Sequence, residues 1–239
     1  MHNKAFGGKN KVRIGIIGPT EREIMPFVNK IDSRETIRHA KIDFYSGKFE
    51  NVDVVAAFSG VCKVNAAIAT QIMIDRFDVT HIILTGVAGA LDERLQIGDT
   101  VIANEIAYHD VAREILTEYH PWMEDIYFKS DMKMLNDASL IAGSLNLKNK
   151  CFIGRIITGE AFITENERYK LIQDFEPLCA DMESAGVAHV CYANNVPFLV
   201  IRSISDFANE DGPESFENNI GNVSFNSLHI VEELIKEYA

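Results

Sequence analysis

The chain has 239 residues, of which 47% are hydrophobic, and its formal net charge is −12 at pH 7. This length and apolar content predict one large domain or two small ones with a sizeable core. The acidic excess argues against nonspecific binding to nucleic-acid phosphates, and no apolar run approaches the ~20 residues that would span a membrane.

Predicted strands and helices alternate along most of the chain. The first half is expected to contain strands at 12–17, 35–48, 52–58, 81–85 and 100–107, with helices at 21–31 and 63–77. A long loop with short helical pieces follows at 108–129. Helices are then expected at 131–145, 165–175, 182–194 and 216–238 (or from 222), with strands at 151–158, 178–182 and 196–204.

This pattern predicts an α/β fold with a mixed, largely parallel sheet. The apolar strands lack strict alternation, which is typical of a sheet covered on both faces. The sequence shows no linker, repeat or low-complexity segment, so residues 12–239 are expected to form a single domain. Residues 1–11 are polar and basic, lack the apolar core of a signal peptide, and are expected to form a flexible arm.

Three carboxylates follow apolar, strand-like runs. They are Glu23, Glu183 and, in the stretch Ser203-Ile-Ser-Asp-Phe207, Asp206. Because ligands of α/β proteins bind beyond the carboxyl ends of strands, Asp206 is a candidate acid whose pKa desolvation would raise. From their spacing alone, Glu21 and Glu23 are better interpreted as ordinary acids in the first turn of a helix.

Two further motifs leave alternatives open. In Thr85-Gly-Val-Ala-Gly-Ala90 the small residues, Ala88 and Gly89 among them, would let a ligand approach the backbone, but a turn that merely fits a helix is equally consistent. In Ala180-Asp-Met-Glu-Ser184 one carboxylate would cap the following helix and the other would accept hydrogen bonds from sugar hydroxyls. Met182 is core filler by default, or a soft wall against a ligand.

Other chemistries are disfavoured. The four cysteines show no C-x-x-C spacing, which favours reduced thiols and a cytoplasmic protein, and the histidines form no H-E-x-x-H pattern, so no metal site is expected. Ile14-Gly-Ile-Ile-Gly18 does not supply the G-x-G-x-x-G of dinucleotide-binding proteins. The chain also lacks the G-x-S-x-G of hydrolase nucleophiles.

The motifs, taken in chain order, resemble those of the 5'-methylthioadenosine/S-adenosylhomocysteine nucleosidases of the nucleoside phosphorylase superfamily. The similarity runs from about Val12 to the C-terminus and includes Ile97-Gly-Asp99, Tyr108-His-Asp110, Ala161-Phe-Ile163 and Arg202-Ser-Ile-Ser-Asp206, besides the motifs above. It implies one α/β domain with a central twisted sheet flanked by helices. It further implies a homodimer, without metal or cofactor, that hydrolyses the N-glycosidic bond of 5'-thio-substituted adenosines.

The resemblance also implies a role for each matching residue. Asp206 matches the general acid that protonates the departing purine, Glu23 the residue that positions the attacking water, and Glu183 the residue that holds the ribose hydroxyls. The matching binding positions are Met182 and Phe162 beside adenine and ribose, the Ile163 backbone at the purine edge, Ser205 beside the acid, Ala88 and Gly89 in the glycine segment, and Phe216 over the 5'-substituent.

The sequence departs from the family pattern at three places. Pro19-Thr20 stands where the family has Ala-Met, which removes an apolar side chain near the sugar, and Val87 stands where the family has Ser. Residues 111–129, which in the family contribute to the dimer contact and to the partner's 5'-pocket, match poorly.

Three alternative functions are weighed against the nucleosidase. A phosphate-dependent nucleoside phosphorylase is disfavoured because Leu84 stands where phosphorylases place an arginine. A nucleosidase acting on aminodeoxyfutalosine would need the same acid and sugar contacts. A catalytically silent nucleoside-binding protein is disfavoured because all three carboxylates are present.

Overall fold

The computed structural model describes residues 11–209 and 211–239, so the expected arm at 1–11 lies outside it except for Lys11. Within these ranges the strands are β1 (Arg13–Gly18), β2 (Asp32–His39), β3 (Ile42–Phe49), β4 (Val52–Phe58), β5 (His81–Ala90), β6 (Thr100–Tyr108), β7 (Phe128–Lys129), β8 (Cys151–Thr158), β9 (Cys179–Asp181) and β10 (Phe198–Asp206). The helices are α1 (Glu21–Val28), α2 (Lys63–Phe77), α3 (Ile115–Glu118), α4 (Met132–Ser144), α5 (Glu165–Phe175), α6 (Ser184–Asn194) and α7 (Gly212–Lys236).

The strands form one mixed sheet in the order β10-β6-β8-β9-β5-β1-β4-β3-β2, with β7 beside β6. Strand β10 also pairs with β5, so β5, β10, β6, β8 and β9 form a closed circuit. The predicted mixed α/β sheet is confirmed. It is not largely parallel, because antiparallel and parallel strand pairs are equally numerous. The antiparallel pairs are β2–β3, β3–β4, β5–β9, β6–β7 and β6–β10.

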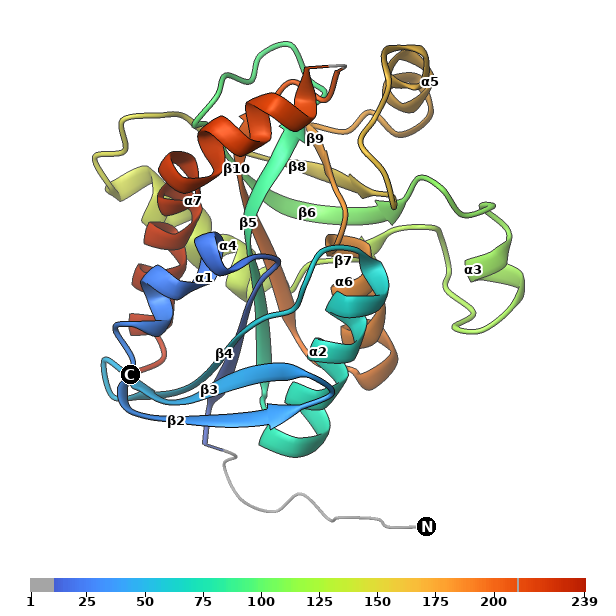
Figure 1. Cartoon of the computed structure of the whole chain (residues 1–239). Coiled ribbons are helices and arrows are strands. Elements are labelled where there is room, and N and C mark those ends of the chain that lie inside the picture. Colours follow the sequence, from blue (N-terminus) through green and yellow to red (C-terminus); the bar gives the residue numbers. More distant parts are fainter. Residues whose placement is uncertain (1–10, 210) are drawn as a thin grey trace.

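Helices cover both faces of the sheet (Figure 1). One apolar core joins α1, α4 and α7 to one face, and a second joins α2 and α6 to the other. Neighbouring residues of β5 show the division, since Ile83 lies in the first core while Ile82 and Leu84 lie in the second. Both faces of a strand are therefore buried, which explains the continuous apolar runs in the sequence.

Several element boundaries differ from the prediction, and three of these differences change the architecture. The strand expected at 35–48 is a hairpin, in which Ala40 and Lys41 take positive φ between β2 and β3. The glycine segment after Thr85 is not a turn, because it continues β5 to Ala90 and pairs with β10. Helix α7 begins at Gly212, earlier than expected, because proline is favourable in the first turn of a helix.

The last residues of β10 are displaced by a bulge. Ile204 pairs with Ala88 and Asp206 with Gly89, so Ser205 is the extra residue. Such bulges redirect side chains beside functional sites. Here the bulge places Asp206 at the carboxyl end of the sheet, beside the ends of β1 and β5, where ligands of α/β proteins bind.

Candidate active site

A cavity of about 200 Å³ opens at the carboxyl ends of β1, β5 and β10. The structure places every predicted site residue in its lining: Glu23, Ala88, Gly89, Phe162, Ile163, Met182, Glu183, Ser205, Asp206 and Phe216. Segments that are far apart in the sequence thus converge on one site. The lining also contains Thr20, Val87 and Asp181, to which the sequence assigned no definite role.

Asp206 is a buried carboxyl group held by neutral donors. Its side chain is 3% exposed. The Ser205 hydroxyl donates to Oδ2 (2.8 Å) and the Ala208 N–H donates to Oδ1 (2.9 Å). Burial raises the pKa of Asp206, and these two hydrogen bonds act in the opposite direction. A Cβ at Gly89 would lie 2.5 Å from Oδ1, so the glycine leaves room for the acid itself.

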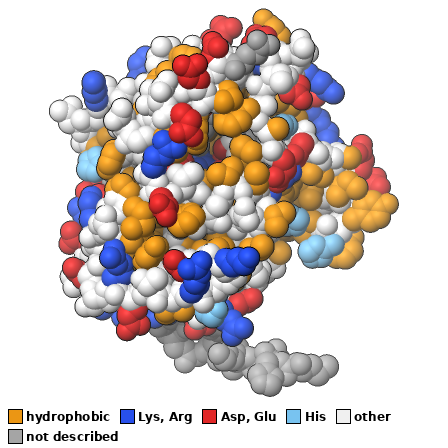
Figure 2. Space-filling model, in the orientation of Figure 1, with side chains coloured by type: hydrophobic (Ala, Val, Ile, Leu, Met, Phe, Trp, Pro, Cys, Tyr) orange, Lys and Arg blue, Asp and Glu red, His pale blue; other side chains and the backbone are white. Residues whose placement is uncertain are grey.

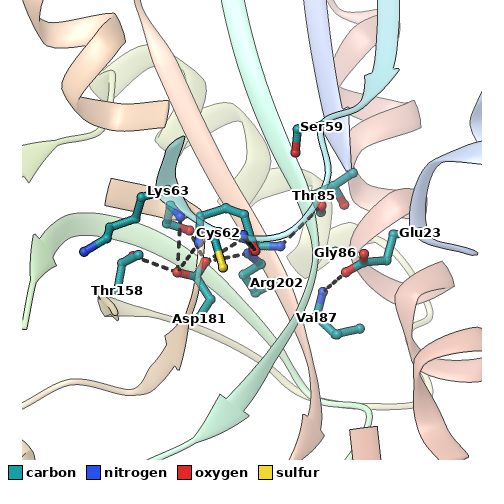
Figure 3. Close-up of polar contacts among 12 residues, drawn as sticks. Glu23, Ser59, Cys62, Lys63, Thr85, Gly86, Val87, Thr158, Asp181 and Arg202 are labelled. Carbon is teal, nitrogen blue, oxygen red and sulfur yellow. Dashed lines mark hydrogen bonds and ion pairs between the residues drawn. The ribbon is translucent and has the colours of Figure 1, made fainter. Parts of the chain in front are cut away.

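Glu23 lies in the first turn of α1 and is 2% exposed. Its Oε2 accepts hydrogen bonds from the N–H (2.9 Å) and the hydroxyl (2.6 Å) of Thr20, and its Oε1 accepts one from the Val87 N–H (2.9 Å; Figure 3). A Cβ at Gly86 would collide with Oε1. Burial raises the pKa of Glu23, whereas the charge of Arg202 and the three hydrogen bonds lower it.

Arg202 is a functional residue that the sequence reasoning missed. The prediction placed a strand end just beyond it, but β10 continues to Asp206 and the Arg202 side chain is fully buried. Its guanidinium lies 2.7 Å from Asp181 Oδ2 (Figure 3). It also lies 3.0 Å from Glu183 Oε2. An arginine inside an apolar strand was the available signal, because a buried charge requires a partner.

The surroundings of Asp181 and Glu183 differ. Asp181 serves the start of α6, where its Oδ1 accepts from the Ser184 N–H (3.2 Å) and from the Thr158 hydroxyl (2.7 Å). Glu183 instead accepts from the Cys62 N–H (2.9 Å) and from Arg202. Burial raises the pKa of Glu183, and the nearby guanidinium acts in the opposite direction. Glu183 therefore has fewer protein contacts than Asp181, which makes it the better candidate to accept hydrogen bonds from a sugar.

The remaining wall of the cavity is apolar. The rings of Phe162 and Phe216 meet edge to face, with centroids 6.0 Å apart. Phe216 reaches the cavity from α7, whose first turns are fastened to the end of β10. There Ser215 and Asn219 donate to the Ser205 carbonyl, at 3.1 and 2.9 Å. The same hydrogen bonds to the Ser205 carbonyl therefore position both Phe216, on α7, and the adjacent Asp206.

The two ends of the cavity differ in their chemistry. Around Asp206 burial raises the pKa and no cation opposes it, although the two hydrogen bonds do, so burial favours a protonated carboxyl group that can deliver a proton. Around Glu23 and Glu183 the buried guanidinium opposes the effect of burial, which still raises the pKa of both carboxyl groups, that of Glu183 to about 7. Among the described lining residues there is no Lys, Arg or His, and no three His, Cys, Asp or Glu side chains of the described chain are grouped to hold a metal ion.

Comparisons with known proteins agree with this geometry. Residues 13–236 match the phosphorylase superfamily. The 5'-methylthioadenosine/S-adenosylhomocysteine nucleosidase of Staphylococcus haemolyticus is 39% identical over 93% of this chain and 99% of its own length.

Solved structures give the same result. The Colwellia psychrerythraea 5'-methylthioadenosine/S-adenosylhomocysteine nucleosidase in complex with adenine has a TM-score of 0.88 at 33% identity, covering 95% of this chain and 96% of its own. The futalosine hydrolase of Helicobacter pylori has a TM-score of 0.87 at 28% identity, with coverage of 95% and 98%. The chain belongs to the 5'-methylthioadenosine/S-adenosylhomocysteine nucleosidase family of the phosphorylase superfamily.

Proposed function

We propose that this protein hydrolyses the N-glycosidic bond of 5'-methylthioadenosine and S-adenosylhomocysteine, releasing adenine and the thioribose. The observation that carries the proposal is the contrast within one cavity. Asp206 is a buried acid with neutral partners, while Glu23 and Glu183 lie beside the buried Arg202. The family membership supports the same reaction.

The reaction needs a proton at the base and negative charge at the sugar. When the C1'–N9 bond breaks, its electron pair leaves with the purine, and Asp206 delivers its proton to N7 so that neutral adenine departs. The sugar becomes oxocarbenium-like, and the anionic Glu23 and Glu183 stabilise it electrostatically. Water then bonds to C1' through its oxygen and gives a proton to Glu23.

Two contacts of Asp206 suit the state that follows proton transfer. The Ser205 hydroxyl and the Ala208 N–H already point at its two oxygens. Hydrogen bonds to an ionised carboxylate are stronger than those to a neutral carboxyl group. The aspartate that remains after the proton has left is therefore stabilised without any rearrangement, which lowers the barrier to its formation.

Phosphate is a poor nucleophile for this cavity. Its binding requires cations or a nest of free N–H groups. The described lining offers four carboxylates and no cationic side chain, and Arg202 is engaged by Asp181 and Glu183. Water is therefore the acceptor in the proposal, and a phosphorylase is disfavoured.

The proposal includes a cytoplasmic homodimer that acts in methionine salvage. Large apolar side chains are exposed around α3, where Ile115, Tyr119 and Trp122 are 45–65% accessible, and Figure 2 shows hydrophobic side chains gathered over this segment at the right of the view. Exposed apolar groups of this kind are typical of interfaces. All four cysteines are free, which suits a reducing compartment. No helix in the described part of the chain is long and apolar enough to cross a membrane.

Release of free adenine from a panel of 5'-substituted adenosines, with and without phosphate, tests the proposal. The panel includes methylthioadenosine, adenosylhomocysteine and aminodeoxyfutalosine. Fastest turnover of the two thio-compounds, independent of phosphate, is expected. Preference for aminodeoxyfutalosine would favour the activity suggested by the futalosine hydrolase neighbour. Tight binding of methylthioadenosine without adenine release would identify a binding protein. Sedimentation at micromolar concentration tests the dimer.

A further inference from the structure

Two helices of this protein begin with the same four-residue pattern. Helix α1 is preceded by Thr20 and has Glu23 at its third position, and helix α5 is preceded by Thr164 and has Glu167 there. In α5 the Thr164 N–H and hydroxyl donate to Glu167 Oε2, at 3.1 and 2.7 Å. In α1 the corresponding distances to Glu23 Oε2 are 2.9 and 2.6 Å. The local geometry is thus repeated.

The surroundings of the two glutamates are opposite. Glu167 is exposed, and its contacts with Thr164 serve only the start of a surface helix. Glu23 is buried in the cavity, where the Val87 N–H holds its other oxygen. Thr20 itself lines the cavity. The same threonine–glutamate contact that caps a surface helix at α5 therefore lies at the candidate site at α1.

We propose that Thr20 is a positioning residue for the hydrolysis: its hydroxyl holds Glu23 in the orientation and the anionic form that activate water. This inference rests on the function proposed above for Glu23. With Thr20 on Oε2 and Val87 on Oε1, both oxygens are held from the protein side. The carboxylate plane is then set by two elements, α1 and β5, and an oxygen lone pair remains for a water molecule.

The charges around Glu23 give the sign of the effect. Arg202 from β10 lowers the pKa of Glu23, and Arg202 is itself shared with Glu183 and Asp181. On the surface side of α1, Arg22 is paired with Glu217 of α7. Burial raises the pKa, and the Thr20 hydroxyl opposes it. Removing that hydroxyl therefore raises the pKa of Glu23, so that a higher pH is needed to ionise it.

The test compares pH profiles of kcat/KM for the wild type and for Thr20→Val, which keeps the shape of the side chain and loses the donor. The acid limb of the profile is expected to move to higher pH by about 1 unit, as suits one hydrogen bond to a charged group. Thr20→Ser keeps a hydroxyl and is expected to restore the limb. Thr164→Val, the matched change at α5, is expected to leave the limb in place.

A second readout separates this inference from the proposed function. NMR of 13C-labelled glutamate carboxyls reports the pKa of Glu23 without any turnover, and Glu23→Gln identifies its resonance. A rise of about 1 pH unit in Thr20→Val or Thr20→Ala supports the inference even if the wild type releases no adenine. An unchanged Glu23 titration in a folded Thr20→Val variant overturns it. If Thr20→Val does not fold, an unchanged titration in Thr20→Ala overturns it equally.

Discussion

The two ends of the cavity use the same kind of side chain in opposite ways. At one end Asp206 meets a hydroxyl and an N–H, and at the other Glu23 and Glu183 lie beside the fully buried guanidinium of Arg202. All three carboxyl groups are buried, and burial raises the pKa of each. The difference lies in the cation, which opposes that rise only at the sugar end.

Under the proposed function, one fold provides an acid and two anions within a single cavity. A carboxyl group with neutral neighbours keeps its proton to a higher pH, while a guanidinium favours ionised neighbours. The position of the guanidinium along the strand therefore sets which carboxyl groups are stabilised as anions. Arg202 and Asp206 lie on the same strand, β10. Under the proposed function, Arg202 acts at the sugar end of the cavity and Asp206 at the base end.

The largest expected effect comes from removing the proton donor. Asp206→Asn keeps the shape of the side chain and cannot deliver a proton to the purine. We expect kcat to fall by about 10²–10⁴-fold, the usual contribution of general acid catalysis. Adenine release measured by chromatography checks this.

Binding of a non-hydrolysable methylthioadenosine analogue, measured by calorimetry, is the control for that variant. Affinity is expected to stay within about tenfold of the wild type, since the contacts of the sugar end are intact. A loss of binding as large as the loss of rate would mean that Asp206 mainly holds the ground state, and the acid role would be wrong.

Removing the cation should abolish the contrast between the two ends. Arg202→Met leaves Asp181 and Glu183 buried without their partner. Breaking a buried ion pair in this way costs about 3–5 kcal/mol of the free energy of unfolding. Urea denaturation at pH 7 measures the loss. Stability equal to the wild type would show that the carboxylates do not depend on Arg202.

The sugar end can be tested by removing one interaction from each partner. Glu183→Gln is expected to lower kcat/KM for methylthioadenosine by about 10–100-fold, as suits one hydrogen bond to a charged group. The 2'-deoxy and 3'-deoxy substrates should lose a similar factor on the wild type. At least one of them should lose much less on the variant. If the losses of kcat/KM from the variant and from the deoxy substrates simply multiply, Glu183 does not contact the ribose.

A smaller effect is expected at the glycine beside the acid. In Gly89→Ala the new methyl would lie 2.5 Å from Asp206 Oδ1, so the carboxyl group must shift. We expect kcat to fall about tenfold, because small displacements of catalytic groups are costly. Gly143→Ala, in helix α4, meets no atom within 4 Å and is the matched control. An equal kcat for both variants would show that Asp206 tolerates displacement.

Part of this site could be predicted from the residues and the rest only from the family resemblance, because spacing alone favoured an ordinary first-turn acid at Glu23. Glu23, Glu183 and Asp206 each follow an apolar run, and the carboxyl ends of strands converge in α/β proteins. The boundaries that were missed depend on tertiary structure. Ala40 and Lys41 take the positive φ of a hairpin without the usual glycine or asparagine. The glycines after Thr85 continue a strand because β10 pairs with them.

The partners of the charged groups could not be predicted from the sequence, because they too depend on tertiary structure. Arg202 on β10 pairs with Asp181 at the end of β9 and with Glu183 at the start of α6. These two partners precede it in the sequence by 21 and 19 positions. The Thr20 hydroxyl could equally have capped its helix in solvent, as Thr164 does. Only the burial of Glu23 by neighbouring elements makes that contact part of the active site.

The pH dependence of adenine release at saturating methylthioadenosine tests the acid role of Asp206 most directly. Its pKa is raised by burial and the protonated form is the active one, so wild-type kcat should fall as the pH rises through that pKa. The residual rate of Asp206→Asn, which has no proton to lose there, should not fall. An alkaline limb of the same midpoint in both proteins would contradict the assignment of Asp206 as the proton donor.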